Sequence, residues 1–470
     1  MKYFGIYRKS EDSTFPSKLI VTDEAVEPQD TQEEEPVEEA EVAEAKPVIK
    51  LDFVELQQDF FEQIHSYIDG LPVLVSFAPL MQGMAFVQLA RKVEKHLSAG
   101  EAIEQGKWKF IPVHEDNLEK LNRRRRLARR EATALDGMER MVLLGAVSQF
   151  DAFLGRLLRV CLERRPDIIS SSEKSFAAHE VLQYSDIEAF KSAVTEKTIE
   201  TFLRKSHQEQ FDWLEKSFDV KLRVDLKSWP SFIEAFERRN LFAHSQGVVS
   251  ETYRIKCLEA GMEEIPNTGT VLNADKEYIA SKLQVFAEIG LKLIQVLARK
   301  LLKDRDALRE LSSVLNNHAY ELITHGHFDL AENLLRFGLL PQMRNEGHTQ
   351  LMMEVNLANS LKLRGDGEEA AKILDRRNWE TTSSEFEISV EAIRGNSQKV
   401  AELISTFHSG KVDPKWCLRH WPVFLHVRDS EDFANAYSER FGEEYSPAFE
   451  VISSNDLEPP DDRKNKDDAL

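Results

Sequence analysis

Apolar residues recur along most of this chain with the spacing of α-helices. From Leu51 onward they return every three to four residues, first at Phe53, Leu56, Phe60, Ile64 and Ile68, which places them on one face of an amphipathic helix. Similar patterns predict helices over residues 198–218, 232–244 and 274–302, and either a helical hairpin or one long helix over residues 117–162. Only 20 glycines and 16 prolines occur in 470 residues, too few for many short strands and turns. The predicted fold class is mainly α.

The stretch from Gly70 to Ala90 contains no charged residue. A run of about 20 apolar residues is long enough to cross a bilayer, but Pro72, Pro79 and several polar side chains interrupt this one. We therefore expect a short buried strand over residues 71–77 followed by a buried helix, and no membrane partner. A membrane span is the alternative.

Both ends of the chain differ from its middle. Residues 1–22 contain two short apolar runs typical of a small hairpin, whereas residues 23–50 form an acidic linker with 11 acidic residues between Asp23 and Glu44 and no Lys or Arg among them. Such a block cannot bury enough apolar surface to fold, and we expect it and the polar tail 451–470 to be disordered. These two ends hold about half of the net charge of −20, so the charge does not exclude a nucleic-acid partner.

A repeated pattern occupies the C-terminal third. Ala319, Gly326 and Ala331 recur 39 residues later as Ala358, Gly365 and Ala370, and a weaker third copy follows. Small residues let two helices approach closely and glycine makes the turn between them, a pattern typical of helix–turn–helix repeats. Residues 306–450 resemble tetratricopeptide-type repeats, which bind peptides or proteins on their concave surface. We expect a protein partner there.

Cysteine and histidine spacings indicate a reduced compartment and no metal site. Cys161, Cys257 and Cys417 are far apart and form no CxxC pair, which is typical of buried cytoplasmic thiols. His207, His325 and His327 have no metal-ligating companions at useful sequence spacing. The chain also lacks a Walker-type loop, a GxSxG motif and an HExxH motif. No metal and no cofactor are expected, and the N-terminus has no signal-peptide pattern.

The most informative segment is Glu237-Arg238-Arg239-Asn240-Leu241-Phe242-Ala243-His244. An Arg, a polar residue and a His four to six positions after the Arg resemble the signature of the HEPN superfamily, matched here by Arg239, Asn240 and His244. The resemblance covers about residues 135–305, which would form a HEPN-like helical bundle after an N-terminal helical region, residues 51–134. It implies a ribonuclease of the bacterial toxin or phage-defence type.

The residue types suit metal-independent RNA cleavage. Histidine titrates near neutral pH and can transfer a proton to or from the reacting oxygens. The Arg239 guanidinium stays charged and matches phosphate geometry, and Asn240, four residues before His244, lies on the same helix face if the helix continues. Arg239 and His244 are five positions apart, or about 140° around a helix. The resemblance therefore implies a homodimer in which two motifs meet across one cleft.

Two further features concern RNA. Arg238 also fits the permitted spacing, although the polar Asn240 directly after Arg239 favours Arg239 as the motif residue. A cluster of six arginines within eight residues of a predicted helix could hold an RNA backbone through phosphate contacts: Arg123, Arg124, Arg125, Arg126, Arg129 and Arg130. The alternative is a solvated face paired with Glu115, Asp116, Glu119 and Glu131.

The leading hypothesis is thus a metal-independent HEPN-type endoribonuclease with a helical-repeat domain that binds a partner. The alternative is a non-catalytic helical adaptor or RNA-binding protein with a degenerate HEPN domain, in which His244 only caps the end of its helix. Burial of His244 against the core of its own chain would favour the adaptor.

Overall fold

The computed structural model describes residues 3–7, 18–22, 52–96, 101, 103–105, 108–110, 112–113, 115–170, 181, 183–410 and 412–448. The linker over residues 23–50 and the tail 451–470, for which we expect disorder, lie outside the described residues. The chain divides after Lys50 into two units. In the first, β1 (Tyr3–Tyr7) and β2 (Lys18–Thr22) pair antiparallel, with Tyr3 opposite Thr22, as the two apolar runs predict.

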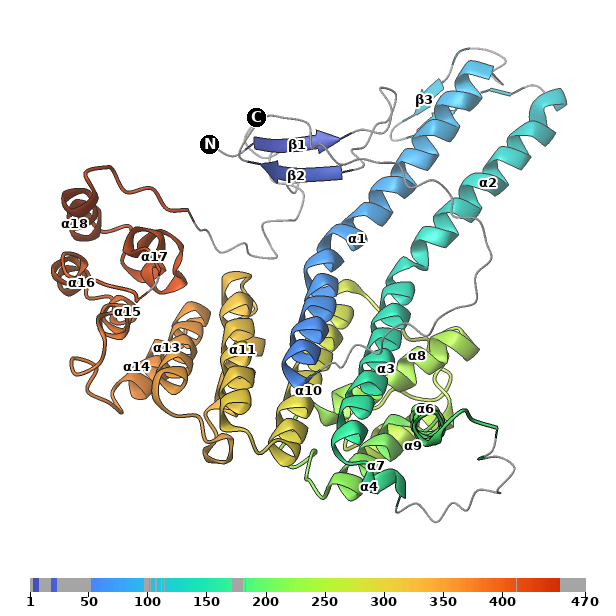
Figure 1. Cartoon of the computed structure of the whole chain (residues 1–470). Coiled ribbons are helices and arrows are strands. Elements are labelled where there is room, and N and C mark those ends of the chain that lie inside the picture. Colours follow the sequence, from blue (N-terminus) through green and yellow to red (C-terminus); the bar gives the residue numbers. More distant parts are fainter. Residues whose placement is uncertain are drawn as a thin grey trace. The chain divides into compact units, whose positions relative to one another are not determined.

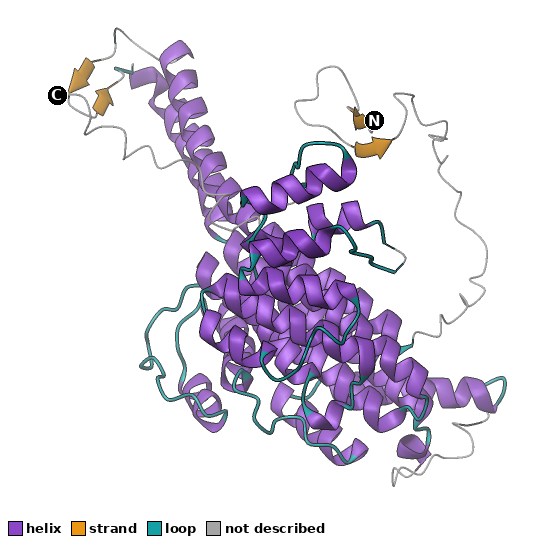
Figure 2. Ribbon diagram, turned by 90° about the vertical axis from the view of Figure 1, so that its left-hand side faces the viewer, coloured by secondary structure: helices purple, strands orange, loops and turns teal. Residues whose placement is uncertain are grey.

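Helices make up almost all of the regular structure in the second unit, which confirms the mainly α fold class (Figure 2). It begins with α1 (Phe53–His96), α2 (Leu118–Asp136) and α3 (Met138–Arg164). Only Gly137 separates α2 from α3, and α1 runs alongside both of them (Figure 1). A short hairpin of β3 (Ile103–Gln105) and β4 (Trp108–Phe110), then η1 (Glu115–Asn117), connect α1 to α2.

The strand expected over residues 71–77 is wrong, because this segment continues α1. Leu71 is buried while Val73 and Leu74 are exposed, which is the one-sided burial of a helix and not the alternation of a strand. Leu71 extends the apolar stripe that starts at Phe53, and α1 packs along α10 and α3. This tertiary packing outweighs the local cost of Pro72 and Pro79 within the helix.

The next helices complete a bundle around α3. They are α4 (Asp167–Ser170), α6 (Ile187–Leu203), α7 (His207–Phe218), α8 (Trp229–Ser245), α9 (Glu251–Glu259) and α10 (Lys276–Leu301). The segment 198–218 is thus two helices, because the Ser206 hydroxyl caps a new start at His207. Aromatic rings from four helices meet in the core, where Phe150 contacts Phe60, Phe232 and Phe286.

Within the described residues, one helix is long and apolar enough to cross a membrane, and it is α3 rather than the uncharged stretch of α1. Thirteen residues of α3 are buried in the protein, among them Phe150, Phe153 and Leu157. A central core helix has the same composition, so the burial of α3 accounts for its apolar character.

Helix pairs follow in the C-terminal third. They are α11 (Arg305–Thr324) with α12 (Phe328–Gly338), α13 (Gly347–Arg364) with α14 (Gly367–Leu374), and α15 (Ser384–Arg394) with α16 (Ser397–Ile404). Then come α17 (Pro414–His420), η3 (Pro422–His426) and α18 (Glu431–Phe441), while η2 (Pro341–Met343) precedes α13. The recurring Ala319 and Ala358 are fully buried, and Gly326 and Gly365 turn the chain with positive φ. Successive pairs pack side by side (Figure 1).

One buried carboxylate joins α8, α9 and α10. Glu234 is 1% exposed, and its oxygens lie 2.6 Å from Arg238 Nε and 2.9 Å from Lys282 Nζ. The hydroxyls of Tyr253 and Tyr278 each donate to it at 2.9 Å. Burial raises the pKa of Glu234, but the charges of Lys282 and Arg238 outweigh burial and hold that pKa below its usual value. The carboxylate is therefore ionised and fully paired.

Replacing Glu234 by Gln would leave two cations without their buried counter-charge. We expect Glu234→Gln to lower the free energy of unfolding by about 3–5 kcal/mol, measured by urea denaturation at pH 7. Glu188→Gln is the control, because Glu188 pairs with Lys191 at the exposed surface of α6 and such pairs contribute little. Equal stability of the two variants would contradict the role given to Glu234.

His318 makes the protein sensitive to acid. Its ring stacks on Phe61 with a centroid distance of 3.9 Å and is buried, and its Nε2 has no hydrogen-bond partner in the part of the chain that the structure describes. Burial lowers its pKa to about 3. In the unfolded chain the imidazole of His318 takes up a proton near pH 6.5, whereas in the folded protein it stays neutral. Lowering the pH from 6.5 to 4.5 therefore reduces the free energy of unfolding by about 2–3 kcal/mol through His318 alone. We expect His318→Phe to reduce the fall of the thermal midpoint over that range, leaving the contributions of His65 and His426, whose pKa values burial lowers to about 4. The same change in the pH profile of the control variant His348→Gln, whose histidine is exposed, would refute this assignment.

Candidate functional site

A cavity of about 560 Å³ lies where α3, α7, α8 and α9 meet. Its polar lining comes mostly from charged side chains of both signs. The cations are Arg204, Lys205, Arg239 and Lys256, and the carboxylates are Asp151, Glu209, Asp212, Glu237 and Glu259. His207 and Asn240 also line it. The structure thus brings Arg239 and Asn240, two of the three motif residues, together in one pocket.

The turn between α6 and α7 places His207. The Ser206 side chain accepts from the backbone N–H of Glu209, and the Glu209 carboxylate accepts from the backbone N–H of Ser206 at 2.8 Å, so a capping box starts α7 at this point. His207 is the first residue of that helix, and its ring stacks on Phe236 of α8 with a centroid distance of 3.4 Å. Capping and stacking together hold the imidazole against the wall of the pocket.

Asp151 connects His207 to Arg239. Its Oδ1 lies 2.9 Å from His207 Nε2, and its Oδ2 lies 3.5 Å from an Nη of Arg239. This arrangement makes Nε2 the protonated nitrogen of His207, because an ionised carboxylate only accepts hydrogen bonds. Burial lowers the pKa of His207, although the hydrogen bond and charge of Asp151 oppose that change. At neutral pH His207 is therefore a neutral, oriented imidazole.

Arg239 keeps hydrogen-bonding capacity that its own chain does not use. Its Nε is buried without a hydrogen-bond partner among the described residues, and 27% of its side chain is exposed. Buried donors are almost always paired in folded proteins. Because this Nε–H is itself shielded from solvent, a ligand in the pocket would meet the exposed part of the Arg239 side chain, and the unpaired donor would gain a partner only after that side chain moves.

His244 lies just outside this pocket. Helix α8 continues to Ser245, so Asn240 and His244 share one face, as the sequence predicts for an unbroken helix. Ile233, Glu237 and Asn240 line the pocket, and His244 is the next position of the same stripe, about 6 Å further along the axis. His244 is exposed, which is the opposite of the burial that would favour the adaptor.

The two neighbouring arginines of the motif have different surroundings. Arg238 pairs with the buried Glu234, donates to the carbonyl of Asn273 at 2.9 Å and lies 3.9 Å over the Tyr278 ring. Its guanidinium is thus occupied by structural contacts, and it does not line the pocket with Arg239. The geometry favours Arg239 as the ligand-facing residue and gives Arg238 no place in an RNA contact.

The arginine cluster lies elsewhere, on α2. Five of its members are exposed there, whereas Arg124 is half-buried and donates to the carbonyl of Lys92 at 3.4 Å. Asp116 and Glu119, the two expected acidic partners whose side chains are described, form no ion pair with the cluster. None of the six arginines lines the pocket beside α8. Any phosphate contact on α2 would be separate from the pocket.

Sequence reasoning missed Asp151 and His207. Asp151 interrupts an otherwise apolar stretch of α3, and a charged residue inside an apolar helix is a signal that could have been used. His207 directly follows Ser206, and Ser206-x-x-Glu209 is the pattern of a capping box. What no spacing predicts is that residues 56 positions apart meet at one carboxylate.

His327 has no metal-ligating companions at useful sequence spacing, but the structure places two potential ligands beside it. His65 and Asp69 of α1 lie beside His327, and the three potential ligand atoms are all within 4.8 Å of one another. The companions were missed because they precede His327 by more than 250 residues and meet it only through the packing of α1 on α11.

The helical repeats have a cavity of their own, of about 470 Å³. Its walls are mainly apolar and aromatic, with contributions from Tyr320, Phe386, Trp416 and Trp421, and the amides of Asn316 and Asn356 lie among them. Mainly apolar walls with a few polar groups are typical of ligand-binding pockets.

No protein-family model, no curated protein and no solved structure matches this chain. Its function is therefore inferred from the geometry of its own residues.

The hydrogen bond between Asp151 and His207 has a measurable consequence. The Asp151 charge raises the pKa of His207, so we expect Asp151→Asn to lower that pKa, followed by NMR titration of ¹³C-labelled histidines. Asp212→Asn is the matched control, because Asp212 lines the same pocket but pairs with Arg223. An unchanged His207 titration in Asp151→Asn, or an equal shift in both variants, would contradict this assignment.

Proposed function

We propose that this protein is a metal-independent endoribonuclease of HEPN type that acts along the exposed face of α8. The single observation that supports the proposal most is the pocket that Arg239, still 27% exposed, lines together with Asn240 and an oriented histidine. The resemblance of Arg239-Asn240…His244 to the HEPN signature supports it independently. A role as a toxin or antiviral defence effector in the cytoplasm belongs to the same proposal.

The reaction is an internal transesterification of RNA. The 2′-hydroxyl of one nucleotide loses its proton and attacks the adjacent phosphorus, the bond from phosphorus to the 5′-oxygen breaks, and that oxygen takes up a proton. The products are a 2′,3′-cyclic phosphate and a free 5′-hydroxyl. Water is not consumed in this step, and both proton transfers are within the capacity of an imidazole near neutral pH.

Each residue of the pocket has a role in this proposal. Arg239 binds the non-bridging phosphate oxygens and stabilises the charge that develops on them. Asn240 orients the phosphate, and His244 transfers protons at its exposed position. Asp151 and His207 act as positioning residues, because Asp151 contacts both the imidazole and the guanidinium.

The homodimer is part of the same proposal. His244 lies beyond the pocket of its own chain, and its exposed ring is accessible to a second copy. Two chains that meet along their α8 helices would bring the Arg239 of one chain near the His244 of the other. A site of this kind is complete only in the dimer.

Purified protein with labelled RNA tests the activity. We expect His244→Ala and Arg239→Ala each to reduce the cleavage rate at least about 100-fold with the fold and dimer intact, and end-group analysis of the wild-type products to find cyclic phosphate. His348→Gln and Arg309→Ala are matched controls, because both residues are exposed in the helical repeats. Undiminished cleavage by folded His244→Ala protein would refute the proposal.

Mixing the two inactive variants tests the shared site. Hybrid dimers of Arg239→Ala and His244→Ala chains retain one Arg239 opposite one His244, so we expect the mixture to recover part of the wild-type rate. A mixture as inactive as its components, with hybrid dimers demonstrated by mass spectrometry, would contradict a site composed of two chains.

A second candidate function is a non-catalytic RNA-binding adaptor. It is favoured by the contact between Arg239 and Asp151, which partly neutralises the phosphate-binding charge within the chain, and by the apolar cavity of the repeats, which suits a protein partner. In that case the wild type would bind RNA with a strong salt dependence and release no cyclic phosphate.

A further inference from the structure

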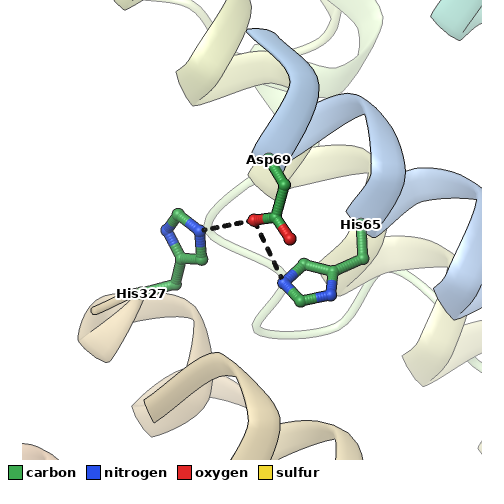
Figure 3. A group of neighbouring side chains, drawn as sticks. All are labelled: His65, Asp69 and His327. Carbon is green, nitrogen blue, oxygen red and sulfur yellow. Dashed lines mark ion pairs between the residues drawn. The ribbon is translucent and has the colours of Figure 1, made fainter. Parts of the chain in front are cut away.

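A cluster of potential metal ligands lies where α1 meets the first helix pair of the repeats. His65 and Asp69 are one turn apart on α1, and His327 stands at the start of α12 (Figure 3). The Nε2 atoms of His65 and His327 lie 3.6 Å and 3.7 Å from Asp69 Oδ1. None of these residues lines the pocket beside α8, so the cluster is independent of the proposed ribonuclease.

His65 is fixed with one nitrogen directed into the cluster. Its side chain is 5% exposed and its ring stacks on Phe61 with a centroid distance of 4.8 Å. Its Nδ1 faces Glu321 Oε1 at 3.4 Å, while its Nε2 is buried without a hydrogen-bond partner among the described residues. The Glu321 carboxylate beside Nδ1 favours a proton on that nitrogen, which would leave the lone pair of Nε2 directed toward Asp69. Carboxylates orient metal-binding histidines in the same way.

His325 has the same orientation. Its Nδ1 lies 2.9 Å from the carbonyl oxygen of Glu321, which keeps the proton on that nitrogen, and its Nε2 lies 4.0 Å from Asp69 Oδ2. Two imidazoles thus turn their Nε2 lone pairs toward one carboxylate. A cluster that existed only for hydrogen bonding would direct an N–H of His65 at Asp69 within about 3.2 Å.

The charge states agree with this geometry. Burial lowers the pKa of His65 to about 4 even though Asp69 opposes it, so the ring is neutral near pH 7. Burial raises the pKa of Asp69, but the hydrogen bond to His327 and the nearby imidazoles hold it below its usual value. A neutral imidazole and an ionised carboxylate are the forms that bind metal ions.

We propose that His65, Asp69 and His327 bind one divalent transition-metal ion of the zinc class, with His325 as the fourth ligand. Ligand atoms about 2.0–2.2 Å from a tetrahedral zinc ion are roughly 3.3–3.6 Å apart. The separations from Asp69 Oδ1 are 3.6 Å and 3.7 Å, and all three ligand atoms lie within 4.8 Å of one another, so metal binding requires side-chain rotations that bring the two imidazole nitrogens closer together. Imidazole nitrogens select zinc, cobalt or nickel over magnesium and calcium, which prefer oxygen ligands.

The site would connect two parts of the chain that are distant in sequence. His65 and Asp69 belong to the helix that packs on α3 and α10, whereas His325 and His327 flank the turn between α11 and α12. An ion held by both would fix the first repeat pair to the helical bundle. Since the unfolded chain separates these ligands by more than 250 residues, metal binding would stabilise the folded state.

Titration of the full-length, untagged protein with ZnCl₂ and CoCl₂ after chelation and desalting tests the proposal. We expect one ion per chain by calorimetry, a tetrahedral Co²⁺ absorption band, and a thermal midpoint raised by about 3 °C at a 100-fold excess over Kd. Asp69→Asn and His327→Gln should each weaken binding at least about 100-fold and abolish the rise in the midpoint. His348→Gln, an exposed histidine outside the cluster, should bind as the wild type does.

Two outcomes would overturn the proposal. One is the absence of saturable binding near one ion per chain in the wild type. The other is unchanged affinity in Asp69→Asn and His327→Gln, which would place any bound zinc elsewhere. If either variant loses its helical circular dichroism, His325→Gln replaces it, because His325 is 38% exposed and the same loss of affinity is expected.

Discussion

The ionised carboxylate of Glu234 is the constraint on which the helical bundle depends. A charge buried to this degree persists only when it is fully compensated, and here two cations and two phenols from α8, α9 and α10 surround it. These contacts fix the rotation of α8 about its axis. Because Arg238 is directed to Glu234, the next residue, Arg239, must point about 100° away, which is toward Asp151 and the open pocket.

Asp151 on α3 links the packing of the helices to the geometry of the pocket in a similar way. Its carboxylate contacts the imidazole of His207 on α7 and the guanidinium of Arg239 on α8. The pocket therefore forms only when three helices pack against one another. The aromatic core provides that packing, since Phe150 and Phe236 each contact Phe232 and Phe286. Apart from the turn of residues 204–206 between α6 and α7, the pocket is lined by helices, and Asp151 contacts both His207 and Arg239 without any ligand.

Much of the fold could be predicted from the sequence because its helices are long and strongly periodic. The helix over 274–302 and the repeat helices occur where spacing and glycine turns place them. Local rules failed where tertiary contacts override them. The uncharged residues after Gly70 suggested a strand, yet the burial of Leu71 against the bundle keeps them in α1. The motif predicted Arg239 and Asn240, but spacing gave no indication that Asp151 and His207 join them.

The surroundings of His244 are the part of the candidate site that the sequence could not predict. It continues the helix stripe of Ile233, Glu237 and Asn240, but the pocket ends one turn before it, so the contacts that the proposed dimer would give His244 cannot be read from one chain. The turn that follows α8 requires glycine: Gly247 adopts a φ of +85°, and an added Cβ there would lie 2.7 Å from the carbonyl oxygen of Leu272. His244 therefore lies in solvent at the end of α8, where a second copy of the chain or an RNA could reach its ring.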